Sequence, residues 1–432
     1  MTAIDDLKGW VTRTLGAICD EVGGIIRTGP FGSQLHQSDY QDEGLPVVMP
    51  KDIVDGRVSV EGIARIGDED VERLSQHSLK KGDIVYGRRG DIGRRALITK
   101  REAGWLCGTG CLRVSLGDSV LDPTFLYYYL GEAKVIGWIY NQAIGATMPN
   151  LNTSIIRSIP ITYPPLPIQH KIAAILSAYD DLIENNTRRI EILEEMARSL
   201  YREWFVNFRF PGHEQVKMVD SELGLIPEGW EVVKIGDVAE VGRGSSPRPI
   251  ADQKYFEGGT IPWIKIADAT KSGKYLYETK QKVNEYGASF SRLLPKGSLI
   301  IAASGTLGYT QLLGVDGCIH DGWLYLLNFN DIEKEYLYYL FREQQQFFYN
   351  AAYGATIQNV NTMILREMKI ILPPSQIQKQ FKDIISNNDN LLDNLGRKNL
   401  NLRQTRDLLL PKLISGEIDV ENLKINTGEI AA

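Results

Sequence analysis

Apolar residues recur at alternating spacings of three and four in two long stretches of the chain, the pattern of an amphipathic helix with one apolar face. The stretches occupy residues 164–210 and 373–415, and each begins at a Pro-Pro pair, which suits a helix start. At 1.5 Å per residue, a helix of some forty residues is roughly 60 Å long. The predicted seam of the first helix consists of Ile172, Ile175, Tyr179, Leu182, Asn186, Leu193, Met196 and Leu200.

The second helix repeats this rhythm and meets Pro411 near its end, where an interior proline removes a helical hydrogen bond. Because each helix needs a partner for its apolar face, we predict that the two pair antiparallel as a coiled-coil spacer. Asn186 is predicted to fix the register of the pair at some cost in stability. The second seam consists of Phe381, Ile384, Leu391, Leu395, Leu402 and Leu409, with Asn388 and Thr405 as polar interruptions.

Outside these helices, short apolar runs are separated by Gly and Pro, which predicts short strands joined by turns. One longer amphipathic stretch, Pro123–Ile139, predicts a helix after the last strand. Residues 1–163 therefore read as an α/β domain with an irregular sheet. The predicted strands of this part are Leu15–Ile18, Pro46–Met49, Asp83–Tyr86, Ala96–Thr99 and Leu112–Leu116.

The second half of the chain repeats the first. Gly145–Thr153, GATMPNLNT, matches Gly354–Thr362, GATIQNVNT, and about half of the 25 residues that start at Gly145 are identical at a constant offset of 209. Gly-Trp pairs open both halves, at Gly9 and Gly229. Internal duplication of this length predicts two copies of one structural unit related by a pseudo-twofold axis.

The predicted fold class is therefore α+β: two globular α/β domains in a pseudo-twofold internal repeat, separated by two long antiparallel coiled-coil helices. The predicted domains are a first globular domain at 1–163, a central long helix at 164–210, a second globular domain at 211–372, a distal long helix at 373–415 and a C-terminal tail at 416–432.

Composition agrees with this organisation. A chain of 432 residues with 43% hydrophobic content forms two or three folded domains. No apolar run approaches the ~18 residues of a membrane span, and the N-terminus lacks the basic and apolar blocks of a secretion signal, so the cytoplasm is the expected location.

The residues also argue against catalysis by this chain. Four irregularly spaced cysteines do not complete a zinc site, and five histidines do not cluster. A phosphate-binding loop of the form GxxxxGK[ST] is missing, and the residues before the Pro-Pro pairs do not match an adenine methyltransferase motif. Asp268, Glu278 and Lys280 have nuclease-like spacing, which a charged chain also produces by chance.

The formal net charge of −6 argues mildly against nucleic-acid binding, but the local charge does not. Eight basic residues stand against two acidic ones in residues 80–101, and eight against four in residues 243–282. Arginine pairs beside glycine allow a close approach to phosphates or a guanine edge. The alternative is a solvated hairpin with surface charge.

Several further segments admit two interpretations. The asparagines of the repeated GAT motif either bind phosphates or shape a loop and cap the helix that follows. Trp204, Phe205, Phe208 and Phe210 either pack into a core or form a docking surface. The candidate DNA-binding residues are Arg27, Ser33, Lys51, Arg88, Arg89, Arg94, Arg95, Thr147, Asn150, Arg243, Arg248, Lys265, Lys271, Lys274, Thr356 and Asn359.

The ordered motifs resemble those of a known family. The repeated GAT…NxNT…PP…IQ closings, FVNFRFPG from Phe205, IPEGWEVVKIGDV from Ile226 and LLLPKLISGEIDV from Leu408 are similar to the DNA-specificity subunit of type I restriction-modification systems over nearly the whole chain. The resemblance implies two target-recognition domains, each binding one half of a split, asymmetric sequence in double-stranded DNA. It also implies long helices that act as spacer and as docking surface.

The resemblance further implies that the chain is non-catalytic and carries no cofactor. S-adenosylmethionine, ATP and Mg would belong to partners, namely two methyltransferase (modification) subunits and the restriction subunits that translocate and cut DNA. The alternatives are a specificity subunit of another modification or restriction type, a DNA-binding adaptor outside restriction, and an enzyme in its own right.

Overall fold

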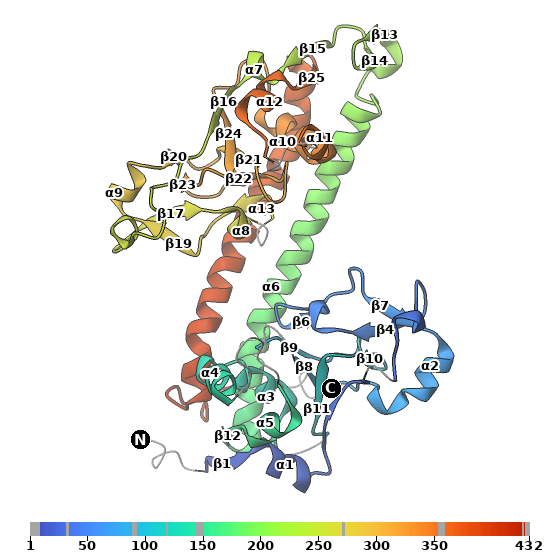
Figure 1. Ribbon diagram of the computed structural model, residues 1–432, viewed down its shortest axis with the longest axis vertical. Helices are drawn as coiled ribbons and strands as arrows, with labels where there is room; N and C mark the ends of the chain where they lie inside the picture. Colours follow the sequence, from blue (N-terminus) through green and yellow to red (C-terminus); the bar gives the residue numbers. More distant parts are fainter. Residues whose placement is uncertain are drawn as a thin grey trace. The chain divides into compact units, whose positions relative to one another are not determined.

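The computed structural model describes residues 9–31, 34–88, 93–117, 120–142, 151–269, 273–352, 359–425 and 427. The chain divides into two compact units. Unit 1 comprises Met1–Asp181 and Leu402–Ala432, and unit 2 comprises Leu182–Asn401. Each unit holds a globular α/β part and a section of both long helices, α6 (Leu166–Tyr201) and α13 (Ser375–Ile414), as labelled in Figure 1.

The globular part of unit 1 is built around a central antiparallel sheet whose two faces are both buried. Along β8, Ile84 and Tyr86 face a core shared with the helices, while Val85 faces a second, smaller core under the other sheet. This alternation is the period of two that a strand imposes on its side chains. The central sheet has the order β2 (Ile25–Thr28), β11 (Cys111–Ser115), β8 (Ile84–Gly87), β9 (Arg95–Leu97).

The second sheet of unit 1 has the order β10 (Leu106–Cys107), β4 (Leu45–Val48), β7 (Ala64–Ile66), β3 (Tyr40–Gln41), with β10 and β4 parallel. Two strand pairs complete the strands, β1 (Val11–Thr14) with β12 (Pro160–Tyr163) and β5 (Ile53–Val54) with β6 (Arg57–Val58). The helices of the globular part are α1 (Leu15–Glu21), α2 (Asp68–Arg73), α3 (Pro123–Tyr129), α4 (Ala133–Gln142) and α5 (Thr153–Ser158).

Two sequence predictions for unit 1 are wrong. Leu15–Ile18 is not a strand but lies in α1, which Thr14 caps by accepting from a backbone N–H of the first turn. The predicted helix Pro123–Ile139 is two helices, α3 and α4, with a break that includes Gly131. A Cβ at Gly131 would fall 1.5 Å from the guanidinium of Arg95, so the break admits that side chain.

Unit 2 repeats this plan with one more strand in its central sheet. Along β21, Leu299 and Ile301 face the core shared with the helices, and Ile300 and Ala302 face the second core. The central sheet has the order β16 (Glu240–Arg243), β24 (Trp323–Leu327), β21 (Leu299–Ala302), β22 (Thr310–Leu313), β18 (Tyr275–Leu276). The second sheet has the order β19 (Gln281–Val283), β17 (Ile261–Ile264), β23 (Gly317–Ile319), β20 (Arg292–Leu294).

As in unit 1, one strand pair of the second sheet, β17 with β23, is parallel. The remaining strands of unit 2 pair as β13 (Met218–Ser221) with β14 (Gly224–Pro227) and β15 (Glu231–Lys234) with β25 (Lys369–Leu372). The helices are α7 (Ile235–Val238), α8 (Ile266–Ala269), α9 (Glu285–Ala288), α10 (Lys334–Glu343), α11 (Gln345–Ala351) and α12 (Thr362–Glu367).

The two units share local hydrogen bonding at the start of each long helix. Asn152 caps α5 and Asn361 caps α12, each accepting from the backbone N–H three residues on at 2.9 Å. The buried amides of Gln169 and Gln378 each donate to two backbone carbonyls and accept from a backbone N–H at 2.8 Å. The helix-capping interpretation of the repeated motif is confirmed for these two asparagines.

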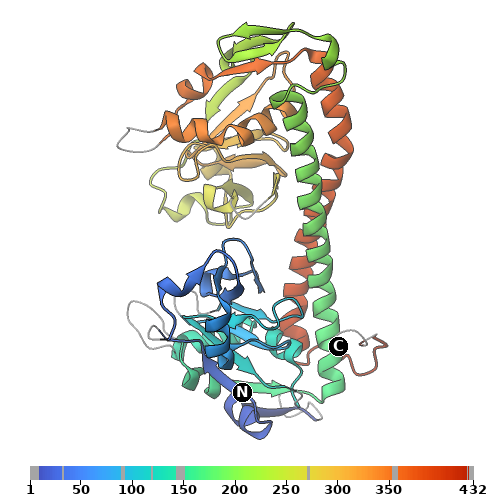
Figure 2. The same cartoon turned by 90° about the vertical axis from the view of Figure 1, so that its right-hand side faces the viewer.

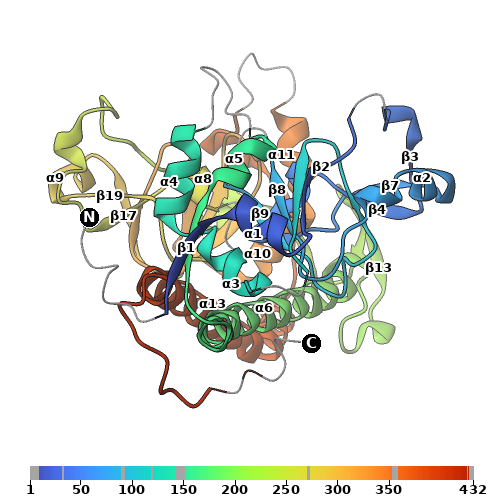
Figure 3. The ribbon, with the colours of Figure 1, turned by 90° about the horizontal axis from the view of Figure 1, so that it is seen from below.

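The sections of α6 and α13 within each unit run antiparallel, side by side (Figures 2 and 3). In unit 1, Ile172 and Leu176 of α6 share a core with Leu413 and Ile414 of α13, and Val420 after α13 packs into that same core. Residues around Val420 therefore belong to unit 1 rather than to a separate tail. In unit 2, the cluster at the end of α6 packs on the start of α13 through Tyr201 and Phe381, whose ring centroids are 6.1 Å apart.

The predicted seam is correct in part. Leu182, Met196 and Ile384 are exposed, and the buried positions near the last two are Ala197 and Ile385. On a straight helix with 100° per residue, Ala197 lies within about 20° of Ile172, whereas Met196 is turned away by about 120°. The buried face thus follows the 3.6-residue period of a straight helix, and a strict heptad drifts off it by about 20° per repeat.

The predicted polar positions of the seam are confirmed for Asn186 and wrong for Thr405. Asn186 Nδ2 donates to Asn399 Oδ1 at 2.9 Å, and the amide of Asn399 lies 3.1 Å from the Thr187 hydroxyl. Thr405, the predicted interruption, is exposed, and Asn388 is half-buried. Asn399 lies on the same straight face of the helix as Ile385. The prediction missed it because it followed a strict heptad instead of the 3.6-residue period.

Candidate nucleic-acid interface

In unit 2, residues 243–248 and the turn between β23 and β24 bring basic and polar side chains together around Asp321, which lies in that turn. Arg248 makes an ion pair with Asp321 Oδ2, and Ser246 Oγ donates to Oδ1 at 3.0 Å. Nε2 of His320 lies 3.0 Å from the same Oδ1. Arg243 Nε donates to the backbone carbonyl of Asp321 at 2.8 Å. We call these five residues the Asp321 cluster.

The protonation of this cluster follows from its contacts. The backbone N–H of Gly322 donates to His320 Nδ1 at 2.8 Å, so the neutral ring carries its proton on Nε2, which lies 3.0 Å from Asp321 Oδ1. Burial lowers the pKa of His320, and the nearby cation Lys265 lowers it further. Partial burial favours the neutral form of Asp321, but the Ser246 hydroxyl, His320 and the Arg248 charge together hold the pKa of Asp321 below its ordinary value.

Two other predicted cations of unit 2 have neutral partners. Arg243 Nη2 donates to Asn359 Oδ1 at 3.4 Å. Lys265 Nζ lies 4.7 Å from the centre of the Trp263 ring and is hydrogen-bonded to Gln281. Their positive charges are therefore not compensated by a carboxylate within the described residues. An uncompensated surface cation is suited to a DNA phosphate.

In unit 1, the corresponding region contains Arg88. Its Nε donates to the carbonyl of Leu151 at 3.0 Å, and its guanidinium lies 5.6 Å from the ring centre of the exposed Phe31. Arg27 is exposed and donates to the Gln76 side chain at 3.1 Å. The structure thus brings the guanidinium of Arg88 and the aromatic ring of Phe31 together.

The other described candidates of unit 1 differ in accessibility. Lys51 and Arg94 are exposed, and Lys51 Nζ donates to a backbone carbonyl at 3.3 Å. Arg95 is half-buried: its Nε donates to the carbonyl of Tyr127 at 2.9 Å, and its guanidinium lies 4.8 Å from that ring centre. Arg95 therefore holds β9 against α3, and its side chain serves packing.

Lys274 is wrong as a surface DNA contact, because its side chain is 1% exposed. Its Nζ forms an ion pair with Asp389 of α13 at 2.6 Å and lies 4.6 and 4.8 Å from the ring centres of Tyr338 and Tyr339. Its backbone N–H donates to Glu194 of α6 at 2.8 Å. Lys274 therefore fastens the globular part of unit 2 to both long helices. Burial lowers its pKa and raises that of Asp389.

Six of the predicted residues lie outside the described residues, and their predictions stay predictions. They are Ser33, Arg89, Thr147, Asn150, Lys271 and Thr356.

The candidate regions of the two units share one backbone scaffold. The N–H of Arg88 in unit 1 and that of Ala303 in unit 2 each donate to a glycine carbonyl of the neighbouring turn at 2.8 Å. Their carbonyls accept from Leu151 and Val360, residues 209 apart, at 2.9 Å. At equivalent places the side chains differ: unit 1 has Arg88 where unit 2 has Ala303.

Sequence reasoning missed Asp321, His320 and Ser246. The signal was present in the repeat, since Cys107-Gly-Thr-Gly110 aligns with Ile319-His-Asp-Gly322 before a buried strand in both halves. Each unit needs a close approach here: a Cβ at Gly244 would fall 2.2 Å from the carbonyl oxygen of His320. Only the folded structure shows that the turn then faces the loop of Arg248.

The structure also places two further groups of residues that the sequence singled out. Asp268 accepts backbone N–H bonds from Lys265 at 3.0 Å and Lys280 at 3.2 Å, so it staples a loop. Among the described residues, no three His, Cys, Asp or Glu side chains converge as metal ligands would. Trp204 and Phe205 are buried in the core of unit 2, which favours the packing interpretation over docking for these rings.

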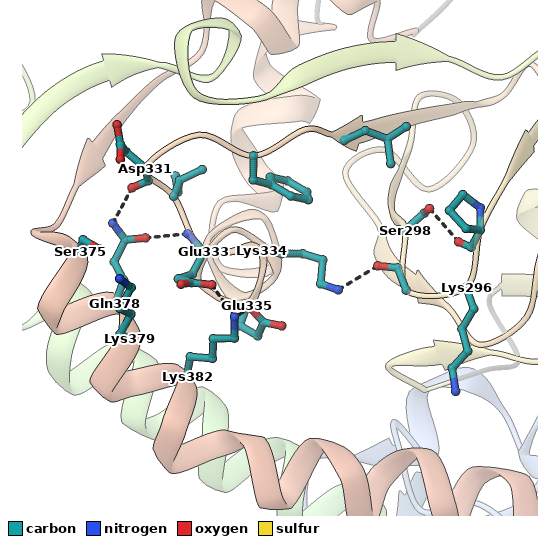
Figure 4. Close-up of a pocket in the computed structure, with 15 residues that line it drawn as sticks. Lys296, Ser298, Asp331, Glu333, Lys334, Glu335, Ser375, Gln378, Lys379 and Lys382 are labelled. Atoms are coloured by element: carbon teal, nitrogen blue, oxygen red, sulfur yellow. Dashed lines mark hydrogen bonds and ion pairs between the residues drawn. The ribbon is translucent and has the colours of Figure 1, made fainter.

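A cavity of about 540 Å³ in unit 2 opens between the starts of α10 and α13 (Figure 4). Two of its lysines have partners in the cavity wall: Lys334 Nζ donates to the Gly297 carbonyl at 3.0 Å, and Lys382 Nζ lies 2.7 Å from Glu333. None of the residues that line the cavity belongs to the Asp321 cluster.

Comparison with known proteins covers nearly the whole chain. It is 28% identical to the type I restriction enzyme MjaIX specificity subunit of Methanocaldococcus jannaschii, over 96% of this chain and 95% of that protein. It is 23% identical to the HindI specificity subunit of Haemophilus influenzae, over 81% and 89%. The fold is similar to the crystal structure of a type I S subunit from M. genitalium, with a TM-score of 0.57, 18% identity and coverage of 96% and 98%.

None of the described helices combines the length and hydropathy needed to cross a membrane. The family model for the type I restriction modification DNA specificity domain matches twice, at residues 8–195 and 227–404, once for each repeat. The chain therefore belongs to the family of type I restriction-modification DNA specificity proteins.

Proposed function

We propose that the Asp321 cluster with Lys265 in unit 2, and the region of Arg88 and Arg27 in unit 1, form the DNA-facing surfaces of a specificity subunit. The chain is the non-catalytic, DNA-recognising component of a type I restriction-modification complex, and each globular domain binds one half of a bipartite target. It acts in complex with methyltransferase and restriction subunits.

The observation that carries the residue assignment is the shared scaffold with unlike side chains. Two domains with the same backbone hydrogen bonds present Arg88 in unit 1 where unit 2 has Ala303, and Asp321 in unit 2 where unit 1 has Thr109. Equal side chains at these places would read equal sequences. Unlike side chains support recognition of two unlike half-sites, because base contacts depend on donor and acceptor patterns.

The finer assembly is also a proposal. Two modification subunits dock on the long helices, in keeping with two repeats in one chain. S-adenosylmethionine, ATP and Mg act in those partners and in the restriction subunits, and the complex works in the cytoplasm, where it meets DNA.

The test is the methylation pattern of cells that express this chain together with its modification subunit. Genome-wide mapping of methylated adenines should give one motif with two unlike specified halves and an unspecified spacer. A continuous motif, or no motif, would contradict the bipartite assignment. Methylation or cleavage of DNA by the purified chain alone would contradict the non-catalytic role.

A further inference from the structure

Within unit 2 the cations of the candidate interface fall into two kinds. Arg243 and Lys265 have neutral partners, whereas Arg248 is paired with the carboxylate of Asp321. The Arg248 side chain is nevertheless 67% exposed. Its ion pair occupies Nη2, and among the described residues the other N–H groups of its guanidinium make no further hydrogen bond.

Asp321 is itself held in place on several sides. Ser246 Oγ donates to its Oδ1 at 3.0 Å and accepts from its backbone N–H at 3.3 Å. His320 Nε2 lies 3.0 Å from the same Oδ1. The carboxylate therefore has a fixed position before any ligand arrives, and it orients the guanidinium plane of Arg248. Ordering an arginine before binding removes part of the entropic cost of ordering it on DNA.

The charge of this pair discriminates between two DNA targets. A phosphate carries a negative charge, and a carboxylate beside the binding cation repels it. The edge of a base is neutral, so a nearly neutral Arg–Asp pair is not opposed by repulsion there. Among base edges, guanine O6 and N7 match the planar fork of arginine with two parallel hydrogen bonds.

We infer that Arg248 reads a guanine in the half-site bound by unit 2, and that Asp321 is the positioning residue that aims it. The inference rests on the proposed function and deepens it. Arg243 and Lys265 then contact phosphates, which set the position of the domain on the duplex without specifying bases.

The experiment uses the assembled methyltransferase complex with duplexes that vary each base pair of both half-sites. In the wild type, replacing one guanine of one half-site should weaken binding by about 5- to 150-fold. Arg248→Lys keeps the charge and loses the fork, so it should reduce that preference to below about 3-fold at this one position. All other positions should keep their preferences.

Asp321→Asn distinguishes the two DNA targets, a guanine and a phosphate, by its effect on DNA binding. Under guanine reading it lowers the preference at the same base pair without tightening binding to other sequences. If Arg248 held a phosphate instead, loss of the carboxylate would strengthen binding to every duplex and steepen its salt dependence. Uniformly tighter binding, or an unchanged preference in Arg248→Lys, would overturn the inference.

Arg209 and Glu203 provide matched controls in the same unit. Their side chains are 64% and 46% exposed and form an ion pair at 3.2 Å, so Arg209→Lys and Glu203→Gln should leave every base preference unchanged. Thermal unfolding of each complex identifies a variant that misfolds. If Asp321→Asn misfolds, the base preference of Arg248→Lys tests the inference on its own. A bipartite wild-type motif that Arg248→Lys leaves intact contradicts only this inference, whereas a motif without two halves contradicts the proposed function.

Discussion

Replacing Lys274 with methionine should destabilise unit 2 strongly, because it leaves Asp389 in a buried site without its cation. Removing one partner of a buried ion pair costs about 3–5 kcal/mol. The two tyrosine rings at 4.6 and 4.8 Å from Nζ add cation–π contacts of about 0.5–2 kcal/mol each. Protonation of Asp389, whose pKa burial already raises, offsets part of this cost. We expect a net loss of about 3 kcal/mol.

The assay is urea unfolding of the full chain, with hydrogen exchange to locate the effect. Amide exchange should accelerate in β18 and α10, which surround the pair, and remain unchanged in the globular part of unit 1. The double variant Lys274→Met with Asp389→Leu should recover most of the loss, because an apolar pair of similar volume is not penalised by desolvation.

Lys382→Met is the matched control, because its ion pair with Glu333 at 2.7 Å leaves the lysine side chain 43% exposed. Exposed pairs contribute about 0–1 kcal/mol. A loss of less than about 1 kcal/mol in Lys274→Met, or an equal loss in the control, would refute the account of Lys274 as the fastening between the globular part and both helices.

Three further predictions concern DNA binding, pH and the helix pair. Arg88→Ala should weaken DNA binding by the assembled complex and reduce its salt slope by about 1 if the arginine meets a phosphate, measured by fluorescence anisotropy; an unchanged slope removes it from the phosphate contacts. Two arginines hold the pKa of Glu343 below its ordinary value, so the stabilisation from these ion pairs is present above pH 4.5 and is lost as the pH falls through the folded pKa. Glu343→Gln should therefore reduce the fall in the free energy of unfolding with decreasing pH. An unchanged fall contradicts this prediction. Asn186→Leu should cost about 1–3 kcal/mol by leaving Asn399 unsatisfied, and Leu at both positions should restore stability in thermal unfolding; a neutral single variant refutes the pairing.

The parts of the fold that sequence predicts well are those set by local or repeated patterns. The long helices follow from periodicity, and the caps at Asn152 and Asn361 follow from an asparagine three residues before a helical N–H. The duplication shows that both halves adopt one plan. Such features need no knowledge of which distant residues meet.

The errors arise where tertiary contacts decide. Leu15–Ile18 is too short for its periodicity to separate a buried helix from a strand, and the cap at Thr14 settles it. Composition cannot show that Lys274 is enclosed by tyrosines while Arg248 is exposed, because both stand in one basic stretch. Asp321 attracts no attention in sequence, since its importance lies in partners more than seventy residues away.

The most direct test of the central claim exchanges one recognition domain. In a hybrid chain, residues 211–372 would be replaced by the corresponding segment of the Methanocaldococcus jannaschii relative. Genome-wide adenine methylation would then be mapped in cells that also supply the modification subunit. We expect one half of the motif to change and the other half to persist, because each unit reads its own half-site. A motif that changes in both halves, or in neither, would contradict independent recognition by the two units.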